Sequence, residues 1–157
     1  MKYTRLTKEQ LEELHPEFSN FLATQSIDKK EWDKIKSEQP QIAEQELDVF
    51  SDLIWEGVLN RAEYLENFSK SHGFLFHCQE TQIKSIVLKC LDESVDLLTA
   101  QGMKFLSDHL FTDAIEIKIG SKPYGGERNE AVFSLIRQGA FLSDGRFYTE
   151  LEKIISA

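Results

Sequence analysis

Residues 41–68 read QIAEQELDVFSDLIWEGVLNRAEYLENF, and their apolar side chains recur at steps of three and four residues. This period is typical of an amphipathic helix, so the stretch predicts one long helix. At ~1.5 Å per residue it would be on the order of 40 Å long and would span the fold as its central element. The apolar stripe comprises Ala43, Leu47, Phe50, Ile54, Val58, Ala62, Leu65 and Phe68.

Two shorter helices are predicted before this one. Residues 4–26 carry a helical apolar period that opens with the capping box Thr7-x-x-Gln10, and we expect a kink at Pro16. A second capping box, Asp28-x-x-Glu31, starts the next helix. Pro40 then ends that helix or restarts the chain, because a proline cannot continue a helix from its interior.

The pattern after residue 73 favours strands. Residues 74–78 and 83–88 are short β-favouring runs separated by four polar residues, which predicts a hairpin. Residues 115–119 alternate strictly between apolar and polar, so they predict a third strand with one solvated face. Residues 127–138 and 144–155 predict two terminal helices, and residues 92–109 predict a helical piece interrupted near Gly102.

These elements together predict a helix-rich α+β fold with a long central helix and a small three-stranded antiparallel sheet. The chain has 157 residues, of which 41% are hydrophobic and 29% charged. This length and composition are typical of one folded domain, so residues 1–157 are expected to form a single domain with one core.

Charge and composition narrow the function classes. The first residues are charged and no apolar run exceeds a few residues, which argues against a secretory signal and a membrane span. Two cysteines are too few for a disulfide framework, so we expect a reducing, cytoplasmic location. A net charge of −9 disfavours binding to nucleic acid and favours binding to a basic protein partner.

The first candidate site is a row of four carboxylates in the predicted long helix: Glu44, Asp48, Asp52 and Glu56. Steps of four residues place them on one helix face, where like charges repel. The row could be solvated, or neutralised by the lysines of residues 29–36 packing alongside. The functional interpretation is a docking face for a basic partner or a second copy of the chain. A divalent metal is a remoter interpretation, because a single row directs its oxygens outward.

The second candidate site is the turn of residues 120–128, which leads from a predicted strand into a predicted helix. Backbone amides at such a junction can bind an anion. A small anionic ligand could be held by the following residues of the turn: Lys122, Tyr124, Gly125, Gly126 and Arg128. The turn does not match the phosphate-binding loop G-x-x-x-x-G-K-[ST], so an ordinary turn and helix cap is the competing interpretation.

No other constellation supports a cofactor, a metal site or catalysis. If the hairpin places Cys78 opposite Ile83, Cys90 lies opposite Ser71, more than about 20 Å along the strand and on the other face. Glu12-x-x-His15 is half of a di-iron signature, and the second half is missing. The leading hypothesis is therefore a non-enzymatic interaction or regulatory module, and the alternative is a small-ligand protein or enzyme that uses the 120–128 turn.

Three stretches resemble a family of short uncharacterised bacterial proteins, a domain of unknown function. They are MKYTRLTKEQL at residues 1–11, Lys122-Pro123-Tyr124, and GAFLSDGR at residues 139–146. The resemblance covers the whole chain. It implies a bacterial, cytoplasmic, single-domain protein and transfers no catalytic residue.

Overall fold

The computed structural model describes residues 1–156 of the chain. Contacts between residues divide the chain into two compact units, Met1–Asn60 and Arg61–Ala157. We refer to them as the helical unit and the sheet unit. The single-domain organisation of residues 1–157 stays a prediction.

The helical unit contains α1 (Lys8–Glu13), α2 (His15–Thr24), α3 (Lys29–Glu38) and nearly all of α4 (Pro40–Arg61). The predicted capping box is confirmed, because Thr7 and Gln10 exchange side-chain to backbone hydrogen bonds at the start of α1. Pro16 lies in the first turn of α2, so the predicted kink is a break between two helices. The Asp28 carboxylate accepts a hydrogen bond from the backbone N–H of Glu31 (2.8 Å) and caps α3.

Aromatic rings join three helices of this unit. The ring of Phe18 in α2 lies 5.3 Å from that of Trp32 in α3 and 5.0 Å from that of Phe50 in α4, both edge-on. Phe21 also contacts Phe50, at 5.4 Å between centroids. Edge-to-face pairs at such distances add to the free energy gained by burial. The helical unit thus has an aromatic cluster of its own.

The long helix ends earlier than its apolar period predicts. Helix α4 stops at Arg61, and β1 (Tyr64–Phe68) follows. The prediction of a helix as far as Phe68 is therefore wrong. Residues 64–68 pair with β2, residues 64–66 also pair with β5, and Leu65 is fully buried. Tertiary pairing outweighs the local helical period here.

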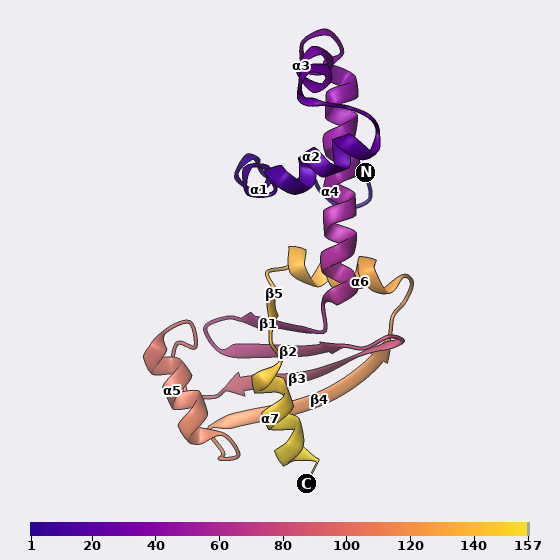
Figure 1. The fold of residues 1–157 in the computed structure, drawn as a ribbon. Helices are drawn as coiled ribbons and strands as arrows, with labels where there is room; N and C mark the ends of the chain where they lie inside the picture. The colour runs from indigo at the N-terminus through magenta and orange to yellow at the C-terminus, as the bar shows by residue number, and fades with distance from the viewer. Residues whose placement is uncertain (157) are drawn as a thin grey trace. The chain divides into compact units, whose positions relative to one another are not determined.

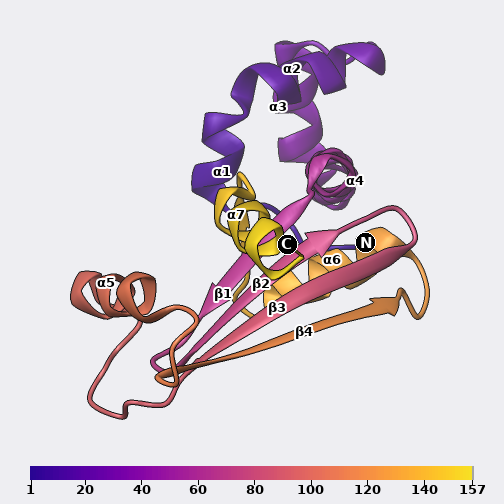
Figure 2. The ribbon, with the colours of Figure 1, turned by 90° about the horizontal axis from the view of Figure 1, so that it is seen from below.

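The sheet has five strands, and the prediction of three is wrong. Besides β1 these are β2 (His72–Cys78), β3 (Gln82–Cys90), β4 (Ile115–Pro123) and β5 (Phe141–Ser143), in the order β4-β3-β2-β1-β5. Every neighbouring pair is antiparallel. Figure 2 shows β1 to β4 side by side, with β4 outermost. The predicted hairpin and its register are confirmed, since Cys78 pairs with Ile83.

One face of the sheet carries the core of this unit. Paired residues share a face, and this face includes Leu75, Ile86 and Leu88, all at most 2% exposed. Helices α5 (Ala100–His109) and α7 (Arg146–Ile155) pack against these strands, and α6 (Arg128–Arg137) connects β4 to β5 (Figure 1). The cluster comprises Leu75, Ile86, Leu88, Cys90, Leu97, Leu106, Ile115, Tyr148 and Leu151.

The segment before α5 is tightly packed. Thr99 caps the helix by accepting a hydrogen bond from the Gly102 N–H (3.0 Å), so residues 92–98 are not helical. The prediction that Gly102 interrupts the helix is wrong, because Gly102 lies in the first turn of α5. A Cβ at this position would lie 1.8 Å from the Asp96 carbonyl oxygen. Only glycine allows so close an approach.

Within residues 1–156, none of the helices is both long enough and apolar enough to cross a bilayer.

Candidate functional site

The acidic row of α4 holds the N-terminal residues of the same chain. The guanidinium of Arg5 reaches two of its members: its Nε donates to Asp48 at 2.7 Å, and its Nη1 pairs with Glu44. Hydrogen bonds to Asp48 first, and then to Glu44, raise the pKa of Arg5. The four-residue spacing of Glu44 and Asp48 therefore places both carboxylates within reach of the Arg5 guanidinium.

Backbone and side-chain donors of residues 2 and 3 meet the rest of the row. The Asp52 carboxylate accepts the backbone N–H groups of Lys2 (2.7 Å) and Tyr3 (2.9 Å). The Tyr3 hydroxyl donates to Glu56, and the Lys2 Nζ lies 3.8 Å from the same carboxylate. Burial, and then the hydrogen bond to Glu56, raise the pKa of Tyr3 to about 12. We call residues 2–5 the N-terminal clamp.

The clamp is anchored by a buried hydroxyl. Ser51 is fully buried in α4, accepts a hydrogen bond from the Leu6 N–H (3.1 Å) and donates to the Leu47 carbonyl (2.7 Å). Leu6 itself is 7% exposed. The extended segment is thus fixed to the helix by apolar burial as well as by charge, and this sets its register on the row.

The chain itself therefore compensates the charge of the row. Arg5 and Lys2 form ion pairs with three of its four members, and Asp52 accepts two N–H groups. Neutralisation of the row by the lysines of residues 29–36 is wrong, because among the described residues its ion pairs are with Lys2 and Arg5, and Lys36 pairs with Asp33 instead (3.5 Å). Docking of an outside partner stays a prediction, and it requires displacement of the clamp.

Two residues of the 120–128 turn that were predicted to bind an anion donate hydrogen bonds to backbone carbonyls of the same chain. The Tyr124 hydroxyl donates to the Gln79 carbonyl at 2.8 Å. The Arg128 side chain donates to the carbonyls of Gln79 (3.2 Å), Cys78 (3.1 Å) and Ala62. Arg128 therefore joins the end of β2 to the residues before β1. The anion site of this turn stays a prediction.

Lys122, Gly125 and Gly126 are exposed. Lys122 lies in β4 opposite Ile83, and the glycines lie in the following turn with no atom near enough to crowd a side chain. The side chains of Tyr124 and Arg128 therefore meet at the Gln79 carbonyl. Lys122, Gly125 and Gly126 do not join them in one binding site.

The two cysteines lie on opposite faces of the sheet. Cys78 pairs with Ile83, and the Cys90 N–H donates to the Ser71 carbonyl (2.8 Å), so the predicted separation of the thiols is confirmed. Both thiols are free and buried. Burial raises the pKa of Cys78 to about 11 although the Arg128 charge opposes the shift, so this thiol is a poor nucleophile at neutral pH. Among the described residues, no three His, Cys, Asp or Glu side chains gather to hold a metal ion.

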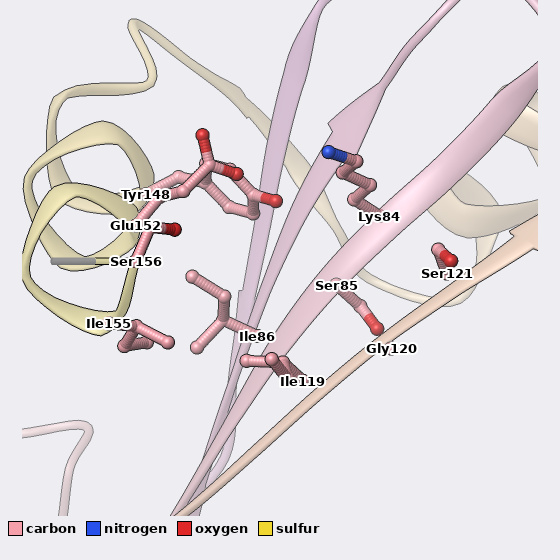
Figure 3. A pocket seen from close by; sticks show the side chains of 10 residues that line it. All are labelled: Lys84, Ser85, Ile86, Ile119, Gly120, Ser121, Tyr148, Glu152, Ile155 and Ser156. Carbon is pink, nitrogen blue, oxygen red and sulfur yellow. The ribbon is translucent and has the colours of Figure 1, made fainter.

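A third site, which the sequence interpretation missed, is a cavity between α7 and strands β3 and β4. Its volume is about 370 Å³. Lys84 extends from β3 toward the side of α7 that carries Tyr148 and Glu152 (Figure 3). Three isoleucines add apolar wall, one each from β3, β4 and α7: Ile86, Ile119 and Ile155. The remaining lining residues are Ser85, Gly120, Ser121 and Ser156.

The polar groups of this cavity differ in charge. Burial first, and then a hydrogen bond to Glu152, raise the pKa of Tyr148, so its hydroxyl stays protonated at neutral pH and donates to that carboxylate. Lys84 is half-buried as a residue, and its ammonium has no ion pair or hydrogen bond with any residue that the structure describes. An ammonium, a carboxylate and a phenol thus line one small cavity.

A row of aligned residues leads into the cavity. Tyr64, His77, Lys84 and Ser121 occupy directly paired positions on β1 to β4, so their side chains share one face of the sheet. The His77 ring stacks on Tyr64 at 4.4 Å and meets Tyr148 edge-on at 5.5 Å. These aromatic contacts fix Tyr148, and hence its hydroxyl, at the rim of the polar row.

No curated protein and no solved structure shows significant similarity to the chain. A family model does match, and it covers residues 1–156, which confirms the whole-chain resemblance to a domain of unknown function. The chain therefore belongs to DUF6495, a family of unknown function.

Proposed function

We propose that the sheet unit binds a small molecule in the cavity between α7 and strands β3 and β4. The observation that carries this proposal is that half-buried Lys84 lines the cavity and its ammonium has no partner among the described residues. A volume of about 370 Å³ lies within the range of roughly 300–1,000 Å³ that small-ligand sites occupy. Ligand sites combine apolar walls with a few convergent polar groups, as this cavity does.

The charges indicate what kind of molecule would fit. Lys84 supplies a cation that suits a carboxylate or a phosphate. The Glu152 carboxylate accepts from Tyr148 and retains lone pairs for an amine or hydroxyl of the ligand. The site therefore suits a small molecule with an anionic group and a nearby hydrogen-bond donor, such as an amino acid or a hydroxy acid. Binding without catalysis is the proposed activity.

A thermal-shift screen tests this function. We expect amino acids, hydroxy acids and small phosphorylated compounds at about 10 mM to include at least one that raises the melting temperature of the sheet unit, because ligand binding stabilises the folded state by mass action. Lys84→Met and Glu152→Gln should each abolish that shift. Lys122→Met is the matched control, since Lys122 is an exposed lysine on β4 outside the cavity, and it should retain the shift. The proposal fails if no compound shifts the melting temperature, or if both cavity variants respond like the parent chain.

We also propose a second binding function, for the acidic row of the helical unit. It is favoured by one observation: the row already binds a basic segment, the N-terminal clamp, through Lys2, Tyr3 and Arg5. A basic segment of a partner protein, or the clamp of a second copy, could make the same contacts. Free, buried thiols fit the reducing, cytoplasmic setting proposed for such an interaction.

Replacing Glu44, Asp48, Asp52 and Glu56 together by glutamine tests the second function. Partners captured at low salt should be lost from this variant, and they should also be lost from the parent chain as salt is raised, because exposed charges are screened. Asp33→Gln is a control outside the row. Unaltered capture and an unaltered oligomeric state in the quadruple variant would remove the basis of this function.

A further inference from the structure

The two edges of the sheet differ in length. One edge is β5, which has three residues, and the other is β4, which has nine. Proteins limit unwanted strand pairing with short edge strands, and β5 fits that pattern. Strand β4 does not, and eight of its nine residues, all except Ile115, are partly or fully exposed. Figure 2 shows β4 as the outermost of the four long strands.

The hydrogen-bond ladder shows which backbone groups of β4 point outward. The Leu91 N–H donates to the Ala114 carbonyl (2.9 Å), so Ala114 faces β3. Backbone groups alternate along an antiparallel strand, so Glu116, Lys118, Gly120 and Lys122 also bond to β3. The N–H and C=O groups of Ile117, Ile119 and Ser121 therefore point to the outer side. No strand that the structure describes pairs with them there.

We propose that β4 pairs in antiparallel fashion with β4 of a second copy of this chain, with Ile119 of each copy opposite the other. In this register Ile117 lies opposite Ser121 of the second copy, so all the outward backbone groups find partners in about six hydrogen bonds. Ile119 is 65% exposed in the single chain. The pairing brings the two isoleucine side chains together and removes apolar surface from water.

The charges on the other face of the strand fit the same register. Glu116 lies opposite Lys122 of the second copy, twice by symmetry, and Lys118 lies opposite Gly120. No like charges therefore meet directly. A shift by two residues toward the C-terminus would place Pro123, which has no N–H, opposite Ile119. The charge pattern thus favours a second copy, because the strand is complementary to itself.

The ends of the strand limit the pairing to its middle. In the proposed register Pro123 lies opposite Ile115. Proline has no N–H to donate, and the Ile115 N–H already donates to the Thr112 carbonyl of its own chain (3.3 Å). Neither residue is left with an N–H that lacks a partner. The proposed contact therefore runs over residues 116–122 and ends without a buried orphan donor.

Charge exchange on the full chain tests the pairing. The molecular mass is measured by sedimentation, without added ligand, from about 5 µM to about 500 µM, a range in which small interfaces associate. The parent chain should shift from monomer to dimer. Glu116→Lys and Lys122→Glu should each weaken the dimer by about tenfold, because each creates two like-charge pairs. The double variant Glu116→Lys/Lys122→Glu should restore it.

Matched variants separate this edge from other surfaces. Ile119→Asp should abolish the dimer, whereas Leu142→Asp on the β5 edge should leave the mass unchanged. Circular dichroism confirms that each variant is folded. A chain that remains monomeric throughout the series overturns the proposal, and so does a double variant as weak as the single ones, because rescue depends on Glu116 facing Lys122. Lys84→Met should not change the mass, so the result does not depend on ligand binding in the cavity.

Discussion

Gly102→Ala is expected to lower the free energy of unfolding of the sheet unit by on the order of 3 kcal/mol. This loss of stability is opposite to the usual effect, since alanine in place of glycine inside a helix normally stabilises the protein by about 1 kcal/mol. The added methyl carbon would lie 1.8 Å from the Asp96 carbonyl oxygen and 2.4 Å from its carbon. Space for it requires α5 or the preceding turn to move.

The Asp96 carbonyl cannot move away easily. It accepts hydrogen bonds from the Thr99 backbone N–H (3.1 Å) and from the Thr99 hydroxyl (2.7 Å). Its neighbour Leu97 is 1% exposed, and the Leu97 N–H donates to the Lys70 carbonyl (2.8 Å). The turn is therefore held at both ends, and the strain of the added methyl group reaches the core.

Urea titration followed by far-ultraviolet circular dichroism, together with amide exchange in β2 and β3, measures this effect. Fluorescence is unsuitable, because both tryptophans, Trp32 and Trp55, lie in the helical unit. Gly126→Ala is the matched control, since no atom lies within 4 Å of the added carbon, and it should change the stability by less than about 0.5 kcal/mol. A Gly102→Ala chain at least as stable as the parent would show that the turn can relax.

Local signals in the sequence correctly predict where α1 and α3 begin. Thr7 and Asp28 accept from the N–H three residues later, as their capping boxes predict. The predicted turn between β2 and β3 is also confirmed, with Cys78 opposite Ile83. These features depend on residues within a few positions of one another. Short-range chemistry is therefore sufficient to predict them.

Strands β1 and β5 depend on partners far along the chain. Ala62, Leu65 and Phe68 continue the helical period of α4, so nothing local marks the change at Arg61. Strand β1 forms because β2 and β5 pair with its two edges, and β5 has only three residues, too few to show an alternation. Long-range pairing decides both strands, and a pattern within one segment does not contain it.

In the candidate sites, too, local spacing predicts some features, and others depend on residues far along the chain. The spacing of Glu44, Asp48, Asp52 and Glu56 correctly places them on one helix face, but Arg5, which neutralises two of them, lies about forty residues earlier. For the cavity a signal was present in the sequence. Lys84 has the same strand parity as Ile86 and Leu88, so a lysine occupies a position of the core-facing side. A charge at such a position indicates a functional or paired site.

Arg128→Leu is expected to cost on the order of 3 kcal/mol in the free energy of unfolding of the sheet unit. The guanidinium donates to the carbonyls of Ala62, Cys78 and Gln79, and a leucine leaves these acceptors without that donor. Each buried acceptor left unsatisfied costs about 1–3 kcal/mol. The Arg128 Nη1 also donates to the Asn129 side chain (2.8 Å), and Asn129 is 6% exposed. The loss is therefore structural and appears without any ligand.

Arg128→Lys and Lys122→Leu complete the experiment. An ammonium cannot reach three carbonyls in the forked geometry of a guanidinium, so the lysine variant should lie between the parent and the leucine variant. Lys122→Leu removes a positive charge from the same turn at an exposed position and should change the stability by less than about 0.5 kcal/mol. Urea titration with and without phosphate distinguishes the two roles of Arg128. If the leucine variant is as stable as the parent, and phosphate stabilises only the parent, Arg128 serves an anion and does not hold the strands.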